Sequence, residues 1–185
     1  SKSEKKIGIV TRSLKTEYCH EVIINATKSL SQKGVFFECW IVGDGPRREE
    51  LVKLAFNMGI QDRVKFLGLV KNSELHQLLD MADIYLSMPN TEGVSSSLFE
   101  AMASGCFPIV SDLPANRAFI EDGVNGFLIE KDNSVQLAEK IHFYMDNHDK
   151  FYNKMLVNRK YIEDHVDFHK NMNIIFREYS KFYQN

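Results

Sequence analysis

Residues 35–46 read VFFECWIVGDGP, an apolar run that ends in a glycine-containing turn and a proline. The run predicts a buried strand over residues 35–42, because a strand covered on both faces needs no alternation of apolar and polar residues. Gly43, Asp44 and Gly45 are typical of a tight turn, and Pro46 suits the first residue of a helix. The stretch therefore predicts a strand followed at once by a helix that ends near Asn57.

The same pattern, a strand followed by a helix, recurs on both sides of this stretch. An apolar run at 7–10 precedes residues with helical spacing at 21–30. Further strands are predicted at 64–67, 83–87, 107–111 and 126–129, with helices at 73–81, behind the serine run 95–97, and at 115–120. Alternating strands and helices predict an α/β fold, a Rossmann-like parallel sheet of about six strands with helices on both faces.

Residues 133–185 differ from the rest, since they carry no strand signal and many aromatic side chains. Residues 134–145 are amphipathic, and the segment is predicted to be a C-terminal helical tail with more than one helix. Its aromatics either pack on the sheet or form an interface, and packing is favoured. With a length of 185 residues, one domain over 1–185 is expected.

Composition excludes several classes of function. A net charge of −2 argues against nucleic acid as a partner. Three cysteines without C-x-x-C spacing, and histidines without metal-ligand spacing, argue against a disulfide framework or a metal site. A small-molecule ligand and a reducing, cytoplasmic compartment are expected.

The segment 91–105, TEGVSSSLFEAMASG, carries the most informative chemistry. A helix should start within its serine run, so that Glu92 lies on the preceding loop and Glu100 in the first turn. The free N–H groups of a helix start favour phosphate, and carboxylates beside it suit the hydroxyls of a sugar and a ribose. The segment thus suggests a sugar-nucleotide site, although Ser97 and Glu100 would also form a capping box.

Ligands of open parallel sheets bind beyond the carboxyl ends of the strands. The loops that follow the predicted strands there are 11–18, 43–46, 68–72, 88–96 and 112–114. One crevice is expected to collect them.

In their order and spacing, these segments resemble the C-terminal, donor-binding domain of GT-B glycosyltransferases of family 4, the group 1 glycosyltransferases. The matching segments are 41–51 (IVGDGPRREEL), 64–68 (VKFLG), 82–87 (ADIYLS), 92–100, 111–117 (SDLPANR) and 122–128 (DGVNGFL). Residues 92–100 look like the E-x7-E motif of that family. The resemblance implies retaining glycosyl transfer from a nucleoside diphosphate sugar, without metal or cofactor, to an acceptor such as a surface glycan.

The same resemblance assigns roles to individual residues. Glu92 would bind hydroxyls of the donor sugar and Glu100 those of the ribose. The base would lie beside Gly68, Leu69 and Val70. The diphosphate would lie beside the backbone of Gly93, Val94, Ser95, Ser96, Ser97 and Leu98.

Members of the family also carry a basic pair after the first strand that neutralises the leaving diphosphate. Arg12 stands at the first position, but Glu17 stands at the second, where lysine is usual. Either Lys15 takes over that role or the donor site is altered. His20 lies near this loop and is expected to be structural, and Ala118 stands where relatives often have Glu.

The resemblance implies an N-terminal acceptor-binding domain that this chain lacks. We therefore expect a piece of a longer hexosyltransferase that is inactive alone, located in the cytoplasm or at the inner face of the cell membrane. Any peripheral membrane contact would be made by the missing domain. Two alternatives stay open, namely a non-catalytic nucleotide-sugar-binding module and a GT-B sugar-nucleotide epimerase or phosphorylase domain.

Overall fold

Six parallel strands form one sheet in the computed structural model, which describes residues 6–93 and 95–165. The strands are β1 (Lys6–Thr11), β2 (Phe37–Val42), β3 (Val64–Gly68), β4 (Ile84–Ser87), β5 (Phe107–Ser111) and β6 (Phe127–Ile129). Their order across the sheet is β3-β2-β1-β4-β5-β6. The order reverses between β1 and β4, which is the point where open sheets of this kind bind their ligands. The predicted α/β fold class is confirmed.

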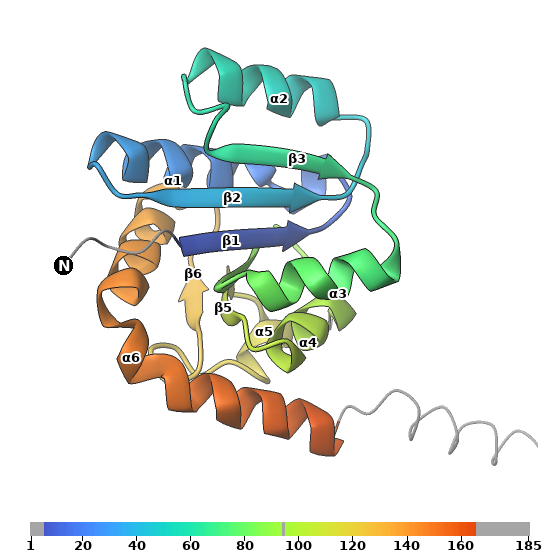
Figure 1. The fold of residues 1–185 in the computed structure, drawn as a ribbon, viewed down its shortest axis with the longest axis vertical. Coiled ribbons are helices and arrows are strands. Elements are labelled where there is room, and N and C mark those ends of the chain that lie inside the picture. The colour runs from blue at the N-terminus through green and yellow to red at the C-terminus, as the bar shows by residue number, and fades with distance from the viewer. Residues whose placement is uncertain (1–5, 94, 166–185) are drawn as a thin grey trace, which may run out of the picture.

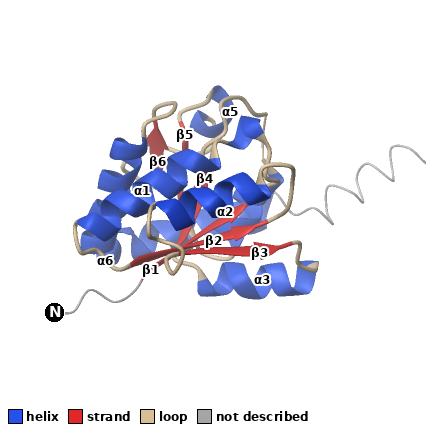
Figure 2. Ribbon diagram, turned by 90° about the horizontal axis from the view of Figure 1, so that it is seen from above, coloured by secondary structure: helices blue, strands red, loops and turns tan. Residues whose placement is uncertain are grey.

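Helices cover both faces of this sheet (Figures 1 and 2). They are α1 (His20–Gln32), α2 (Arg48–Asn57), α3 (Asn72–Met81), α4 (Ser96–Ala103), α5 (Pro114–Arg117) and α6 (Ser134–His165). Seen from above, α1 and α2 lie on one side of the sheet and α3 on the other (Figure 2). None of the helices described is both long enough and apolar enough to cross a membrane.

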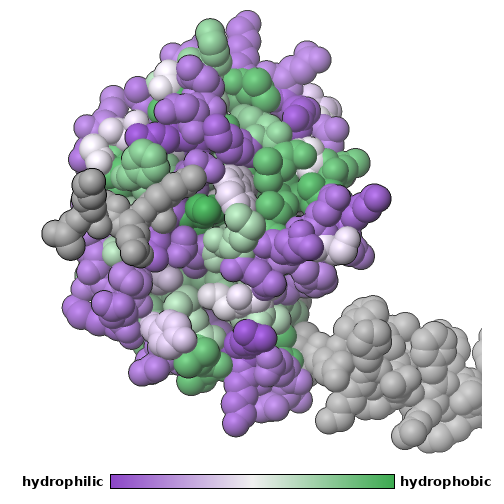
Figure 3. Space-filling model, viewed as in Figure 1, coloured by the Kyte–Doolittle hydropathy of each residue, from purple (hydrophilic) through white to green (hydrophobic). Residues whose placement is uncertain are grey.

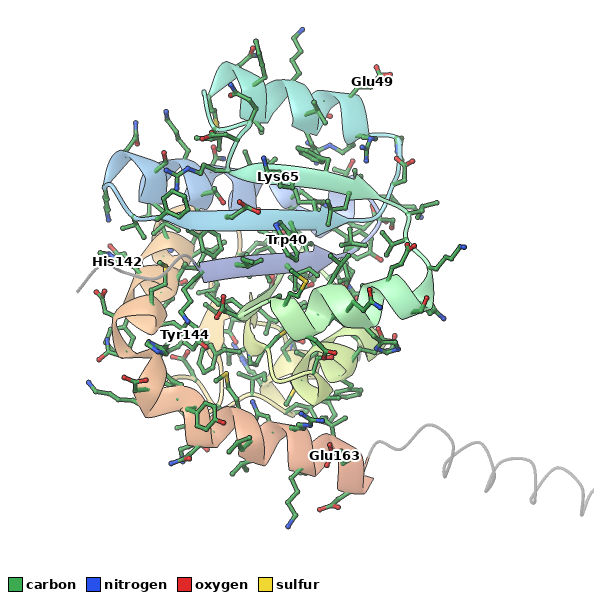
Figure 4. The ribbon with its side chains drawn as sticks, viewed as in Figure 1. Trp40, Glu49, Lys65, His142, Tyr144 and Glu163 are labelled. Carbon is green, nitrogen blue, oxygen red and sulfur yellow. The ribbon has the colours of Figure 1, made fainter. Side chains whose placement is uncertain are left out.

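The two faces of the sheet form two separate apolar cores. Ile9 and Val10 are neighbours in β1 and belong to opposite cores, because successive strand residues point to opposite faces. The first core joins the sheet to α1, α2 and α6 through Ile23, Ile41, Leu51, Phe107 and Tyr144. The second joins it to α3 and α4 through Trp40, Leu79, Tyr85, Leu98 and Met102. Figure 4 labels one residue of each, Tyr144 on α6 and Trp40 on the sheet.

Helix α6 contributes side chains to both cores because it is kinked. Asn147 has non-helical angles (φ −127°, ψ 17°), so the segment consists of two helices joined at a kink, as predicted. Tyr144 stacks on Phe107 with ring centroids 4.5 Å apart, and beyond the kink Ile162 reaches the second core. Tyr144 and Phe151 of the tail are buried in the first core, as the favoured interpretation expects, whereas Phe143, Tyr152 and Tyr161 are exposed. The rest of the predicted tail, 166–185, lies outside the described residues.

Candidate functional site

Two loops meet where the strand order reverses. The loop after β1 contains the 3-10 helix η1 (Thr16–Tyr18), and the loop after β4 covers 88–95. Because β1 and β4 are paired, the loops leave the sheet side by side. The backbone N–H of Asn90 donates to the Glu17 carbonyl oxygen over 3.0 Å and ties them together. Two of the five loops predicted to share a crevice are therefore adjacent at this edge of the sheet.

Arg12 lies where these two loops meet. Its Nη2 forms an ion pair with Glu92 Oε1 and donates a hydrogen bond to Ser95 Oγ. Its Cζ lies 5.5 Å from the centre of the Tyr18 ring, within the range of a cation–π contact. The Arg12 and Glu92 side chains are only 13% and 16% exposed. Arg12, Glu92 and Ser95, all predicted site residues, thus meet at one point.

Ser95 caps the helix that follows. Its Oγ accepts the N–H of Leu98 over 3.3 Å, so Ser95 is the N-cap and α4 begins at Ser96. The N–H groups of Ser96 and Ser97 have no partner inside the helix, as at any helix start, and favour an anion. Gly93 lies in the exposed loop, with no atom within 4 Å of the position that a Cβ would take. Val94 lies outside the described residues.

The position of Glu100 differs from the prediction. Because α4 begins at Ser96, Glu100 lies in the second turn and not in the first. The capping-box alternative is wrong as well, because the N-cap is Ser95 and not Ser97. Glu100 is exposed and lines a groove of about 1000 Å³ between α3 and α4. Asn72 of α3 also lines this groove, and Glu163 of α6 does so from another helix (Figure 4).

A smaller pocket of about 220 Å³ opens at the ends of β1, β2 and β3. Leu69 and Val70 line it together with Gly43 and with Arg12, the residue that also contacts Glu92 and Ser95. Leu69 is 81% exposed, and apolar side chains gather on the surface where β3 ends (Figure 3). Gly68 closes β3 in the left-handed region (φ 72°), and its carbonyl accepts the N–H of Gly43. The predicted base-binding segment thus borders an open apolar pocket.

Lys15 and Glu17 are both exposed. Neither side chain makes a hydrogen bond or ion pair with the described part of the chain, whereas Tyr18 of the same loop contacts Arg12. The structure therefore does not join Lys15 to Arg12 and Glu92. Sequence reasoning missed Tyr18, since no spacing signal distinguishes an aromatic residue in a loop.

Burial shapes the electrostatics around Arg12 and Glu92. It raises the pKa of Glu92, and the nearby Arg12 opposes this only in part. Burial likewise raises the pKa of Tyr85 in β4, whose neighbours include the hydroxyls of Thr11 and Ser87. Thr11 and Ser87 end β1 and β4, so three hydroxyls that sequence reasoning did not single out line this end of the sheet. The ion pair of Arg12 and Glu92 therefore lies in poorly solvated surroundings.

The turn after β2 supports the loop that carries Arg12. Leu14 donates its N–H to the Asp44 carbonyl and accepts the N–H of Arg47, each over 3.0 Å. A Cβ on Gly43 would overlap the Arg12 carbonyl oxygen, and one on Gly45 would come within 2.7 Å of the Leu14 carbonyl oxygen. The turn lies at residues 46–47 and α2 begins at Arg48, two residues later than Pro46 suggested, while Gly43 and Gly45 let the loops pack backbone to backbone.

His20, the first residue of α1, is fully buried. Neither ring nitrogen has a hydrogen-bond partner among the described residues. Burial and the positive charge of Arg47 lower the pKa of His20 to about 4, against a smaller opposite effect of the Arg12 backbone. His20 is therefore neutral at neutral pH, in keeping with a structural role.

Acidification is expected to destabilise the protein through His20. Because the pKa of His20 is lowered in the folded state, the stability that this residue contributes is present above pH 6.5 and is lost as pH falls toward 4. Between pH 7 and pH 5 the loss amounts to about 2 kcal/mol. Urea unfolding of His20→Leu should show a free energy of unfolding that depends less on pH by this amount. The exposed control His76→Gln should retain the wild-type dependence, and equal pH slopes in wild type and His20→Leu would contradict the prediction.

No group of three or more His, Cys, Asp or Glu side chains within 6–93 and 95–165 could hold a metal ion.

The chain is similar to known proteins in sequence and in fold. The sequence model of the family described as "Glycosyl transferases group 1" matches residues 1–173. The chain is 30% identical over 140 residues to N-acetyl-alpha-D-glucosaminyl L-malate synthase of Bacillus anthracis, which covers 76% of this chain and 36% of that protein. It is 32% identical over 123 residues to the amylovoran biosynthesis glycosyltransferase AmsK of Erwinia amylovora, covering 63% and 30%. The chain spans about a third of the length of the curated relatives it matches.

Two solved structures show the same fold. HepE of Anabaena in complex with UDP-glucose superposes with a TM-score of 0.86 at 21% identity, over 96% of this chain and 49% of HepE. The C-terminal domain of the group 1 family protein LpcC of Francisella tularensis superposes with a TM-score of 0.79 at 21% identity, over 88% and 87%. The superpositions agree with the strand order and the helical layers described above.

Proposed function

We infer the function of this chain from its family, because the chain belongs to the group 1 glycosyltransferases. We assign it the binding of a nucleoside diphosphate sugar as the donor for glycosyl transfer. One observation carries this assignment: Arg12 meets both Glu92 and the N-cap of α4 at the point where the strand order reverses. A guanidinium beside a helix start is suited to a diphosphate.

The donor would extend along the predicted crevice in three parts. The diphosphate would lie between Arg12 and the N–H groups of Ser96 and Ser97. The ribose would reach Glu100, and the base would enter the pocket beside Leu69. Arg12 lines that pocket and also contacts Ser95, which supports a ligand continuous from base to phosphate.

In the proposed reaction an acceptor hydroxyl attacks C1 of the donor sugar, the bond from C1 to the diphosphate breaks, and the hydroxyl proton passes to the leaving diphosphate. Negative charge then develops on the leaving diphosphate. Arg12 and the start of α4 would stabilise this charge without a metal ion, since both are preorganised. Glu92 would hold the sugar hydroxyls. Retention of anomeric configuration is proposed from the resemblance to family 4.

The acceptor would bind outside this chain, in a domain of a longer protein. The chain spans only about a third of its curated relatives, which supports this division. We propose that the isolated chain binds donor without turning it over, and that the complete enzyme acts at or near the inner face of the cell membrane. A surface glycan is the proposed acceptor class, since AmsK is named for amylovoran biosynthesis.

Calorimetric titration of the chain with UDP, GDP and ADP, and with a sugar derivative of each, tests the donor site. One base should bind clearly above the other two. Glycosyl transfer should then appear only when the remaining domain of the protein is supplied. Absence of binding by all six compounds would overturn the assignment.

Replacing Glu100 with alanine should weaken binding of the preferred nucleoside diphosphate by roughly ten- to thirty-fold, as expected for loss of hydrogen bonds to a carboxylate. Binding of inorganic pyrophosphate, which has no ribose, should not change. Glu163→Ala, at another wall of the same groove, is the matched control and should bind both ligands as wild type does. An equal loss for pyrophosphate in Glu100→Ala would show that Glu100 does not act on the ribose.

A further inference from the structure

Two groups that the donor needs are engaged with each other in the structure. Nη2 of Arg12 contacts both Glu92 Oε1 and Ser95 Oγ. Both charged side chains are largely shielded from water, so their attraction is screened less than that of an exposed pair. An unscreened pair of this kind competes effectively with a ligand for either partner.

The proposed function requires Arg12 and Glu92 to contact different parts of the donor. Arg12 must face the diphosphate and Glu92 the sugar hydroxyls. A phosphate oxygen that approaches Arg12 while Glu92 is still paired meets a carboxylate of like charge, which costs binding energy. Diphosphate binding by Arg12 and its pairing with Glu92 therefore exclude each other in part.

We propose that Glu92 couples the sugar to the diphosphate, so that the site selects a nucleotide sugar over the free nucleoside diphosphate. When a sugar occupies Glu92, Arg12 is released to the diphosphate. After transfer the sugar has left the site, so Glu92 pairs with Arg12 again. The affinity for the product nucleotide then falls. The inference rests on the proposed function, and it makes Glu92 a determinant of specificity and of product release.

The other contacts of Arg12 make this exchange feasible. Ser95 is only 5% exposed and is fixed as the N-cap of α4. The ring of Tyr18 contacts the guanidinium from the loop after β1. Both can hold Arg12 at the start of α4 when Glu92 turns to the sugar, so one partner of Arg12 changes while two remain. Pairing with Glu92 then lowers the fraction of Arg12 that is competent for phosphate, and apparent affinity falls by that fraction.

The test compares each free nucleotide with its sugar derivative, using the pairs UDP and UDP-glucose, GDP and GDP-mannose, and ADP and ADP-glucose. The pair that binds wild type most tightly is then titrated against Glu92→Gln and Glu92→Ala. Free nucleoside diphosphate should bind both variants on the order of ten-fold more tightly than wild type. The affinity for the nucleotide sugar should not increase. The variants should therefore lose the preference for the nucleotide sugar over the free nucleotide. Thermal unfolding confirms that each variant is folded.

Two controls separate competition for Arg12 from simple charge repulsion. Glu17→Gln removes an exposed carboxylate from the facing loop and should leave both affinities within about two-fold of wild type. In an Arg12→Gln background, Glu92→Gln should give a much smaller gain, because no guanidinium remains to be released and only the like-charge repulsion is relieved. An equal gain in that background, an equal gain from Glu17→Gln, or no gain from either Glu92 variant would overturn the coupling and leave the proposed function standing. Failure of wild type to bind any pair would overturn the proposed function itself.

Discussion

Arg12→Ala is expected to weaken binding of the preferred nucleoside diphosphate about 100-fold or more. Charge-assisted hydrogen bonds contribute roughly 1.5–3 kcal/mol each, and the substitution removes a guanidinium that contacts the capped start of α4. It also leaves Glu92 without its partner, so that an uncompensated carboxylate faces the phosphate. Both effects lower the affinity for the nucleoside diphosphate. Isothermal titration calorimetry of the folded variant measures the loss.

Lys15→Ala tests the alternative that the sequence left open. Lys15 is exposed and is not joined to Arg12 or Glu92, so a loss of less than about three-fold is expected. Lys53→Ala, an exposed lysine of α2, is the matched control for removal of one positive charge. A loss with Lys15→Ala comparable to that of Arg12→Ala would show that Lys15 moves in to serve the diphosphate in place of the usual lysine at position 17.

Arg12→Lys separates charge from geometry at the same position. Lysine keeps the positive charge but cannot contact Glu92, Ser95 and a phosphate through several fixed N–H groups. We expect Arg12→Lys to bind the nucleoside diphosphate more tightly than Arg12→Ala does. Its affinity should be at most about a tenth of the wild-type affinity. Full recovery would mean that charge alone is needed, and that the contact with Ser95 has no part in binding.

Local sequence predicted the elements well because the strands are strongly apolar. The strand expected at 35–42 is β2, Phe37–Val42, shorter by two residues since pairing with β1 begins at Lys6 and Phe37. The start of α4 was expected within the serine run, and it lies there. The turn that holds Glu100 was misplaced, because three consecutive serines offer three caps. The choice of Ser95 coincides with a contact from Arg12, which is 83 positions away in sequence.

The site was predicted as a set of loops but not as a set of contacts. That Arg12 and Glu92 share an edge follows from the rule for parallel sheets. Their pairing depends on β1 lying beside β4, and the order of strands is a property of the whole chain. The buried hydroxyl of Tyr85, which lies near that of Thr11, depends on the same adjacency. A local pattern contains none of this information.

Gly43→Ala should lower the free energy of unfolding by about 2–4 kcal/mol. The added Cβ would overlap the Arg12 carbonyl oxygen and lie 3.0 Å from its carbon, and backbone atoms cannot rotate away as a side chain can. Overpacking costs roughly 1–3 kcal/mol, and φ of 139° adds strain for any residue with a Cβ. The expected fall in melting temperature is about 10 °C. Differential scanning calorimetry measures it.

Gly59→Ala is the matched control, because Gly59 also has a positive φ (67°) but open space around the position of a Cβ. It should cost about 1 kcal/mol, the strain alone. The difference between the two variants then reports the contact between the turn after β2 and the loop after β1. Relief of that contact must move the backbone of Arg12, and a displacement there carries the guanidinium away from Ser95 and the start of α4. Gly43→Ala should therefore weaken nucleotide binding even at temperatures where it is fully folded, whereas Gly59→Ala should not, and wild-type affinity in folded Gly43→Ala would show that the turn supports stability alone.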